Sequence, residues 1–315
     1  MKRLLAFGGL VASIVVAAAT AANVARAPAL LTYSAVYPLG KTGASGGLCL
    51  ARADGSRRVR LTRRKPDRSS SWSPNGRFVV FARAVGTGAA AQILVADTRG
   101  RVVRELKSAG ANADPAWAPD GRRIAYVSSD RGSHIVIANA ATGRILAQTP
   151  TRVGLVSRPA WSPDSRRIAY AEQLDIDAGK QAGSSRIVII NADASGRRVL
   201  LGQASDPTWS PNGAKIAYVA YASRLAEAGD IAVANADGSG ARSLTATSAS
   251  ESRPAWSPSG RLIAFARGSA AASAVYVVPG SGGRERLVVR SRSYGAADPA
   301  WRRPTRLPKA RRPAC

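Results

Sequence analysis

Residues 116–121 read Ala-Trp-Ala-Pro-Asp-Gly, and the apolar run Ile-Ala-Tyr-Val follows at residues 124–127. Five close copies of this phrase occupy residues 71–76, 116–121, 160–165, 208–213 and 255–260, and a degenerate sixth copy surrounds Trp301. Together they hold all six tryptophans of the chain, which are spaced by 45, 44, 48, 47 and 45 residues. A repeat of about 45 residues is typical of proteins built from stacked or radially arranged structural units.

Each repeat has the pattern of a four-stranded antiparallel sheet. The Pro-Asp/Asn-Gly step fixes one φ, adds a short polar side chain and supplies a residue that tolerates positive φ, which favours a tight turn. Apolar strands follow, such as residues 124–127 and 135–138, and then a second turn and a short last strand. With the tryptophan segment, each unit has four strands and matches one propeller blade. We therefore predict an all-β fold, a six-bladed β-propeller over residues 28–302.

The two ends of the repeat region complete each other. Three strands are predicted before Trp72, near residues 32–36, 47–53 and 57–62, without a tryptophan strand ahead of them. Trp301 lies in a tryptophan strand without the three strands that should follow it. We predict that residues 297–302 supply the missing strand, so that a C-terminal strand closes the first blade and removes exposed sheet edges.

The N-terminus has the pattern of a secretory signal peptide. Met1-Lys2-Arg3 is positive, residues 4–22 are small or apolar and uncharged, and small-x-small cleavage patterns follow. We expect residues 1–27 to be removed and the mature chain to reach the periplasm, the cell envelope or the extracellular space. An uncleaved anchor is the alternative, since about 19 uncharged residues just span a bilayer.

Two further expectations concern the C-terminus. Residues 303–315 form a basic, proline-rich tail that we predict to be extended. In an oxidising compartment Cys49 and Cys315 can form a disulfide, which would tie the two ends of the chain together. Two independent thiols are the alternative.

The repeated motifs resemble a known family. The Trp-Ser-Pro-Asp/Asn-Gly phrase, the Ile-Ala-Tyr/Phe strand, the Asn-Ala-Asp-Gly-Ser-Gly turn and the Arg-Ser-Leu-Thr segment look like the WD40-like repeat of TolB-type β-propellers. The resemblance covers roughly residues 30–302 and is more specific for fold than for function. TolB proteins carry a further domain before the propeller. This sequence has no room for one between the leader and the first blade, so the resemblance implies a propeller without the TolB N-terminal domain.

Charged side chains alternate in sign three residues before each tryptophan. We call these six residues the channel ring: Ser69, Asp114, Arg158, Asp206, Arg253 and Asp298. Because the innermost strand of a blade runs along the central channel, we expect them to surround one mouth of it. Inter-blade ion pairs that fix blade register are one interpretation. The other is a polar funnel that binds a ligand or the chain end of a partner.

The channel ring defines two faces of the predicted propeller. Loops between the second and third strands lie on the ring face, and residues 172–185 and 221–230 are longer there than residues 128–133. Extra loop length on one face is typical of a binding surface, and drift in a tolerant loop is the alternative. The opposite face, which we call the turn face, is predicted to collect the arginines beside the Pro-Asp-Gly turns. Such a face suits an anionic polymer or lipid, and solubility together with an arginine-rich compositional bias is the alternative.

Composition excludes several function classes. Lys+Arg 46 against Asp+Glu 19 gives a net charge of +27, but the arginines lack the interleaved aromatic residues that nucleic-acid binding by base stacking needs. A single histidine, His134, and two cysteines exclude a zinc finger. The Gly-x-Ser-x-Gly match at residues 43–47 lacks a strand-to-helix setting, and residues 175–186 lack the last ligand of a calcium loop. We predict no metal, no cofactor and no enzymatic activity.

These observations predict a monomeric, exported, non-catalytic propeller that binds an envelope protein or peptide through the ring face. The alternative is a structural module that docks on anionic envelope polymer or lipid through the turn face.

Overall fold

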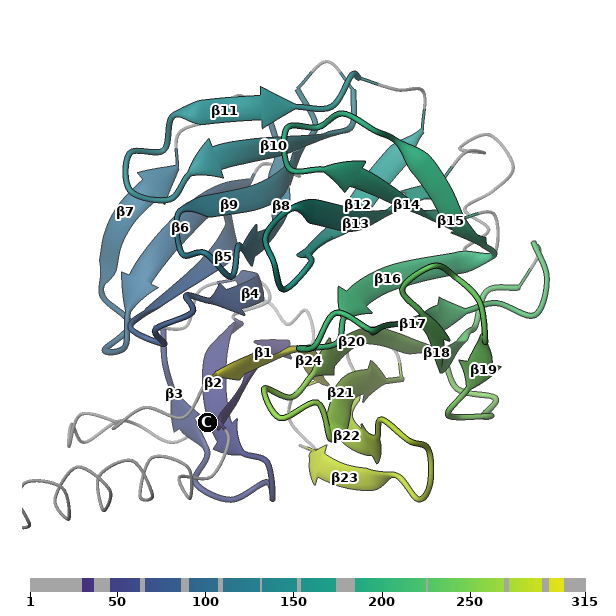
Figure 1. The fold of residues 1–315 in the computed structure, drawn as a ribbon. Coiled ribbons are helices and arrows are strands. Elements are labelled where there is room, and N and C mark those ends of the chain that lie inside the picture. The colour runs from purple at the N-terminus through teal and green to yellow at the C-terminus, as the bar shows by residue number, and fades with distance from the viewer. Residues whose placement is uncertain are drawn as a thin grey trace, which may run out of the picture.

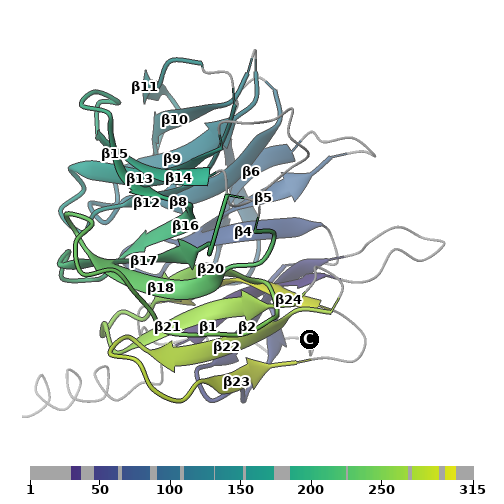
Figure 2. The ribbon, with the colours of Figure 1, turned by 90° about the vertical axis from the view of Figure 1, so that its right-hand side faces the viewer.

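The computed structural model describes residues 30–36, 46–62, 66–85, 91–106, 110–130, 132–151, 154–173, 185–224, 226–268, 272–290 and 295–302. The predicted signal peptide, the basic tail and Cys315 lie outside these residues. Six four-stranded antiparallel sheets surround a central axis, each with one strand innermost and one at the periphery (Figures 1 and 2). Within the described ranges, no helix is long and apolar enough to cross a membrane.

The innermost strands are β4 (Asp67–Trp72), β8 (Asn112–Trp117), β12 (Leu155–Trp161), β16 (Ala204–Trp209), β20 (Glu251–Trp256) and β24 (Gly295–Arg302). The second strands are β5 (Phe78–Ala84), β9 (Arg123–Ser128), β13 (Arg167–Gln173), β17 (Lys215–Ala220), β21 (Leu262–Arg267) and β1 (Leu30–Val36). The third strands are β6 (Ala91–Asp97), β10 (His134–Asn139), β14 (Ser185–Asn191), β18 (Asp230–Asn235), β22 (Ala274–Pro279) and β2 (Gly47–Arg52). The outermost strands are β7 (Val102–Leu106), β11 (Ile145–Gln148), β15 (Arg198–Gly202), β19 (Arg242–Ser243), β23 (Arg286–Val289) and β3 (Val59–Arg60). The predicted six-bladed, all-β fold is confirmed.

The first blade is closed by the C-terminal strand, as predicted. Its strand order is β24-β1-β2-β3, so the last strand of the described chain is the innermost strand of the first blade. β24 and β1 pair antiparallel from Leu30 opposite Arg302 to Val36 opposite Gly295. The closing strand begins at Gly295 rather than at residue 297, because the pairing continues to the far end of β1.

The hydrophobic core lies between neighbouring blades. One cluster joins Val219 and Ile231 of one blade with Ile263, Phe265 and Val278 of the next. Both faces of a blade are therefore covered by its neighbours, and a strand that is buried on both faces is apolar throughout rather than alternating. This explains why the second and third strands are near-continuous apolar runs in the sequence.

The tryptophans connect each blade to the preceding one. The indole N–H of Trp161 donates to the carbonyl of Ala116 at 3.1 Å, and that of Trp301 donates to the carbonyl of Ala255 at 2.8 Å. The guanidinium of Arg123 lies over the Trp161 ring, 4.8 Å from its centroid. These contacts agree with a structural role for the repeated tryptophan, because each indole is wedged between two sheets.

The turns after the innermost strands have the predicted conformation. Gly121 and Gly213 have φ of 74° and 73°, and Ser165, which replaces glycine in the third copy, has φ of 59°. In the first copy the Ser73 hydroxyl donates to Asn75 Oδ1 at 2.8 Å, which orders the turn from within. The left-handed φ explains the preference for glycine at this position.

Arg302 fastens the closing strand to the blade that begins with β4. Its side chain is buried, and its Nε and Nη2 donate to the carbonyl oxygen of Gly76 at 3.0 and 2.8 Å. The guanidinium also lies over the Trp72 ring, 4.9 Å from the centroid. The last described residue therefore holds the two blades together at the point where the circle closes.

Replacing Arg302 tests this closure. We expect Arg302→Met to lower the free energy of unfolding by about 2–4 kcal/mol, since it removes a cation–π contact and leaves a buried carbonyl without its donors. Chemical denaturation measures the change, and Arg99→Met at an exposed turn position is the control. An Arg302→Met protein as stable as this control would contradict the role of Arg302 in closure.

Candidate functional site

The channel ring lies on six equivalent β-bulges. In each innermost strand the register shifts so that two residues face one residue of the second strand, and the first of the two is the ring residue. All six ring residues have positive φ, between 48° and 59°. This region is uncommon for residues other than glycine and costs on the order of 1–3 kcal/mol per residue. The fold imposes the same local conformation in every blade, which re-aims the ring side chain.

Two sequence signals accompany the bulge. Proline follows the ring residue in five blades, as in Asp114-Pro115, while Ser70 follows Ser69. Proline lacks an N–H and is tolerated at bulges and on edge strands, and the innermost strand is the inner edge of its sheet. The single residue opposite each bulge is a buried aromatic, for example Tyr126 in β9 or Phe265 in β21. In the sequence these aromatic residues read as part of an apolar strand, and nothing in the pattern marks them as the partners of a bulge.

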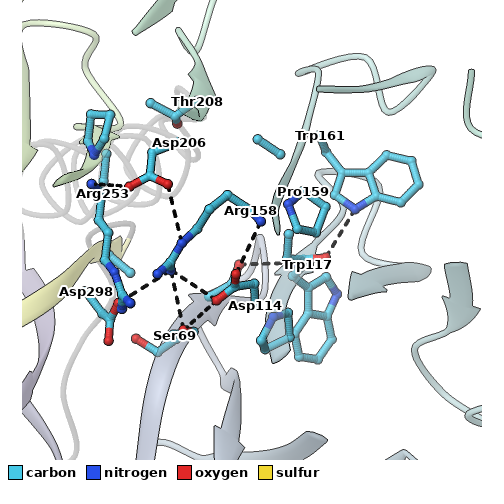
Figure 3. Close-up of a pocket in the computed structure, with 18 of the residues that line it drawn as sticks. Ser69, Asp114, Trp117, Arg158, Pro159, Trp161, Asp206, Thr208, Arg253 and Asp298 are labelled. Carbon is cyan, nitrogen blue, oxygen red and sulfur yellow. Dashed lines mark hydrogen bonds and ion pairs between the residues drawn. The ribbon is translucent and has the colours of Figure 1, made fainter. Parts of the chain in front are cut away.

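Arg158 is the centre of the ring (Figure 3). Its Nη1 lies 3.1 Å from Asp114 Oδ1 and 3.5 Å from Asp298 Oδ1, and its Nε lies 3.6 Å from Asp206 Oδ1. Nη1 also lies 3.4 Å from the hydroxyl of Ser69. One guanidinium therefore reaches residues from four other blades and crosses the channel.

Backbone and hydroxyl donors complete the network. The N–H of Arg158 donates to Asp114 Oδ2 at 3.2 Å, and the N–H of Arg253 donates to Asp206 Oδ2 at 2.8 Å. Ser69 Oγ donates to Asp114 Oδ1 at 2.8 Å. Each of these bonds joins neighbouring blades, so they fix blade register as well as side-chain position.

The remaining ion pair joins Arg253 and Asp298, whose side chains are in direct contact. The carboxylate of Asp298 is 5% exposed, whereas the Arg253 side chain keeps 29% of its surface accessible. The ring thus contains three carboxylates against two guanidinium groups, and its cations are more accessible than its most buried anion.

Burial and charge act in opposite directions on the ring groups. Burial raises the pKa of Asp114, but Arg158, Arg253 and the hydrogen bonds from Ser69 and the Arg158 N–H together lower it below the ordinary value of 3.8. Burial and the like charge of Arg158 lower the pKa of Arg253 to about 9, against the opposing effects of Asp114 and Asp206. Near neutral pH Asp114 is therefore ionised and Arg253 protonated.

The structure brings all six predicted ring residues together. Adjacent ion pairs were expected, and Asp114–Arg158, Arg158–Asp206 and Arg253–Asp298 form them. The sequence reasoning missed the contacts across the channel from Arg158 to Asp298 and Ser69, because spacing along the chain says nothing about how far a long side chain reaches.

A cavity of about 300 Å³ adjoins the ring along the channel axis. The ring side chains, the residues between them and the tryptophans of the inner strands line it, and it includes Pro119 of the turn that follows Trp117. The cavity therefore extends from the ring toward the turn face, and the ring separates it from the opposite mouth.

The loops on the ring face are partly described. In residues 221–230, the Tyr221 hydroxyl lies 2.9 Å from Ser205 Oγ, next to the ring residue Asp206. The first residue of this loop therefore lies beside the ring, which agrees with the face predicted for the loop. Most of the other long loop, residues 174–184, lies outside the described residues, together with residues 175–179 of the calcium-loop comparison.

Cys49, His134 and the Gly-x-Ser-x-Gly match were also considered in the sequence, and their locations are as follows. Cys49 is buried in β2, and because Cys315 lies outside the described ranges, the disulfide stays a prediction. His134 begins β10 and is buried, with Nδ1 3.3 Å from the Gly132 carbonyl oxygen. Of the Gly-x-Ser-x-Gly match, residues 43–45 lie outside the described residues.

Buried acid–base pairs near the ring were not predicted. Asp67, two residues before Ser69, accepts two hydrogen bonds from Arg83 at 2.6 and 2.9 Å. Glu251, at the equivalent position of the β20 blade, is paired with Arg267 at 2.6 Å. The sequence does contain a signal for these pairs, namely an acidic residue at the start of the inner strand and an arginine at the end of the second strand. In an antiparallel pair these two positions lie opposite each other.

The turn face carries exposed arginines, as predicted. They occupy the position after the turn in four blades: Arg77, Arg122, Arg166 and Arg261. Other arginines have structural partners, for example Arg104, which donates to the carbonyl of Ala140 in the next blade at 2.8 Å. Part of the positive charge therefore stabilises the contacts between blades.

The fold and site define a closed six-bladed propeller whose channel is crossed by an ion-pair network. Residues 107–305 match the family described as TolB beta propeller domain, and the chain belongs to this family. Residues before 107 continue the same repeats, which the blades β1–β3 and β4–β7 confirm.

Individual relatives agree with this membership. A stretch of 59 residues is 39% identical to Tol-Pal system protein TolB 1 of Novosphingobium aromaticivorans, and this match covers 19% of the chain and 13% of that protein. TolB from Acinetobacter baumannii superposes with a TM-score of 0.71 at 20% identity, over 96% of this chain and 75% of that one. Hydrazine synthase of Kuenenia stuttgartiensis gives a TM-score of 0.67 at 14% identity, over 88% and 47%.

An enzyme is also similar in fold. Oligogalacturonate lyase in complex with manganese has a TM-score of 0.52 at 16% identity, over 84% of this chain and 74% of that one. At such identities the likeness concerns the fold alone. The described residues contain no group of three histidine, cysteine or acidic side chains placed to hold a metal ion.

Acid titration tests the electrostatics of Asp114. Because its pKa is lower in the folded chain, the ionised carboxylate stabilises the fold fully above about pH 3.8, and this stabilisation is lost as the pH falls through the folded pKa. We expect the melting temperature of Asp114→Asn to lie below that of the parent at pH 7 and the difference to shrink in acid. Glu227→Gln, at an exposed loop position, is the control. A difference that stays constant with pH would refute the assignment.

Arg158 is expected to be the most important ring residue for stability. Arg158→Met leaves three carboxylates with one guanidinium. We expect it to lower the free energy of unfolding by about 2–4 kcal/mol. This is less than for a fully buried ion pair, because the Arg158 side chain is 20% exposed. Adding Asp114→Asn should restore part of the loss, since it removes surplus negative charge. Equilibrium denaturation measures both, with Arg122→Met on the turn face as control. Additive losses would show that the two residues do not interact.

Proposed function

We propose that this protein is an exported, non-catalytic β-propeller that binds an envelope protein or peptide through its ring face. The observation that carries the proposal is the channel ring, in which six strained positions present charged and hydroxyl groups at one end of the channel. Strained backbone conformations cluster at binding and catalytic sites, where the fold holds side chains in a fixed geometry.

Membership of the TolB propeller family supports a partner in the envelope. The relative from Novosphingobium aromaticivorans is a protein of the Tol-Pal system, although the match covers only a small part of it. The propeller occupies residues 28–302 in this proposal, residues 1–27 direct export and residues 303–315 form a basic tail. We propose that the mature protein acts as a monomer in the periplasm or at the cell surface.

The state of the ring argues for binding rather than catalysis. A general base or acid works best with a pKa near the operating pH, whereas the pKa of Asp114 is lowered by its neighbours. The three ring carboxylates are held by guanidinium or N–H contacts, which favours fixed recognition over proton transfer.

The turn face favours a second candidate function. Four exposed arginines at equivalent positions would attract anionic envelope polymer or lipid. The effect of salt on binding distinguishes the two functions. The Debye length falls to about 3 Å in 1 M salt, so binding through the exposed arginines should be weakened by salt.

Capture from an envelope fraction tests the proposal. Immobilised protein should retain its partner in about 0.5 M salt, because a shape-specific contact is less sensitive to screening. Asp206→Asn should weaken capture several-fold while the double change Arg166→Glu and Arg261→Glu leaves it intact. Asp237→Asn, on an exposed turn away from the ring, is the matched control for Asp206→Asn. Capture that collapses in salt and with the arginine changes would refute the proposal and support docking through the turn face.

A further inference from the structure

A second cavity lies on the ring face and borders the channel ring at Arg253 and Asp298. Its volume is about 370 Å³, within the usual range for sites that hold small ligands. It lies among the strand ends of three consecutive blades, those of β20–β22, of β24, β1 and β2, and of β4 and β5. We call it the lateral cavity.

The walls of the lateral cavity are mostly small and apolar. Four alanines line it, Ala35, Ala84, Ala266 and Ala297, together with Gly46 and Gly268. Small side chains leave the space open where three blades meet. A ligand group that enters it would therefore contact methyl groups on most sides.

Two acidic side chains in the wall are already neutralised. Asp67 accepts two hydrogen bonds from Arg83, and its side chain is fully buried. Asp298 contacts Arg253 and Arg158 within the channel ring. A cationic ligand would have to displace one of these arginines, so the acids do not make the cavity a cation site.

The unused polar groups in the wall favour an anion. Arg68 is exposed and forms no ion pair within the described ranges. Ser273 is 4% exposed, and its hydroxyl has no hydrogen-bond partner among the described residues. A buried hydroxyl without a partner costs free energy unless a ligand completes it, so Ser273 points to a bound acceptor.

The charge near Arg253 agrees with an anionic ligand. After burial and Arg158, the positive charge of Arg68 contributes to the lowered pKa of Arg253. Arg68 and Arg253 both line the cavity, so an anion bound between them would relieve this repulsion. A guanidinium binds a carboxylate through two parallel hydrogen bonds, which gives direction as well as affinity.

We propose that the lateral cavity binds the C-terminal carboxylate of a peptide, with Arg68 pairing the carboxylate, Ser273 donating to it and a small apolar last side chain against the alanines. This inference rests on the proposed function, since it assigns one end of the partner to the ring face. A free short-chain carboxylic acid has the same chemistry and is distinguished by the test.

Titration with small probes tests the proposal. N-acetyl-trialanine with a free carboxylate should bind the full-length protein, as followed by NMR or calorimetry, and its C-terminal amide should bind at least about tenfold more weakly, as expected for the loss of a charged hydrogen-bonding group. Butyrate is the second arm. Butyrate binding as tight as that of the peptide would overturn the chain-end assignment, and equal binding of acid and amide would overturn the carboxylate site.

Two variants locate the site. Arg68→Gln should weaken the peptide about tenfold or more, whereas Arg77→Gln, an exposed arginine on the turn face, should not change binding. Ser273→Ala should weaken it about threefold to tenfold and leave the melting temperature of the unliganded protein unchanged or higher, since it removes a hydroxyl without a partner. Unchanged binding in Arg68→Gln, or a lower melting temperature in Ser273→Ala, would overturn the proposal.

The peptide-binding result and the capture result can fail separately. If the peptide does not bind but capture still depends on Asp206, only the lateral cavity assignment fails. If the peptide binds through Arg68 but capture depends on salt and on the turn-face arginines, the carboxylate site stands and the proposed envelope partner fails.

Discussion

The antiparallel pairing of β24 with β1 closes the propeller. It joins segments more than 250 residues apart in the chain and turns a row of blades into a closed circle. Without it, the inner edge of the first blade would be unpaired, and Asp298 would not reach Arg158 and Arg253. The channel ring is thus a product of closure, because no single blade contains two of its members.

Much of the architecture could be predicted from the sequence because the repeats support one another: a strand or turn that is doubtful in one copy is clear in the others. Six tryptophan segments at nearly constant spacing specify blade number, and the unmatched strands at both ends specify the closing strand. The boundaries were less accurate, as Gly295 shows, because β24 continues for as long as β1 offers partners. Strand length there is decided by pairing and not by the residues of β24 alone.

The site was predictable only as a set of positions. The alternation of Asp114, Arg158, Asp206, Arg253 and Asp298 is visible in the sequence, but the bulge that aims them comes from the pairing of the inner and second strands within each blade. The reach of Arg158 across the channel depends on how far the blades are apart. The lateral cavity was not predicted, since four alanines from distant segments carry no pattern that marks them as one wall.

Several of the arginines have a structural role between blades, which the net charge alone does not reveal. Only seven of the 46 basic residues are lysines, and several arginines donate to backbone carbonyls of the next blade. The planar guanidinium offers several donors in a fixed fork and stacks on aromatic rings, which an ammonium does not. Arginine therefore suits the contacts between blades, which offer carbonyl acceptors and indole rings. Part of the positive charge of the chain belongs to these contacts.

The register of the closing strand has one more consequence. Leu30 and Arg302 are the first and last described residues, and they lie directly opposite each other in β1 and β24. The Cα atoms of paired residues in an antiparallel ladder are only about 5 Å apart. A short linker would join them into one uninterrupted backbone, which could then be cut in any peripheral loop. Circularly permuted versions of residues 30–302 that start at another blade are therefore expected to keep the same packing.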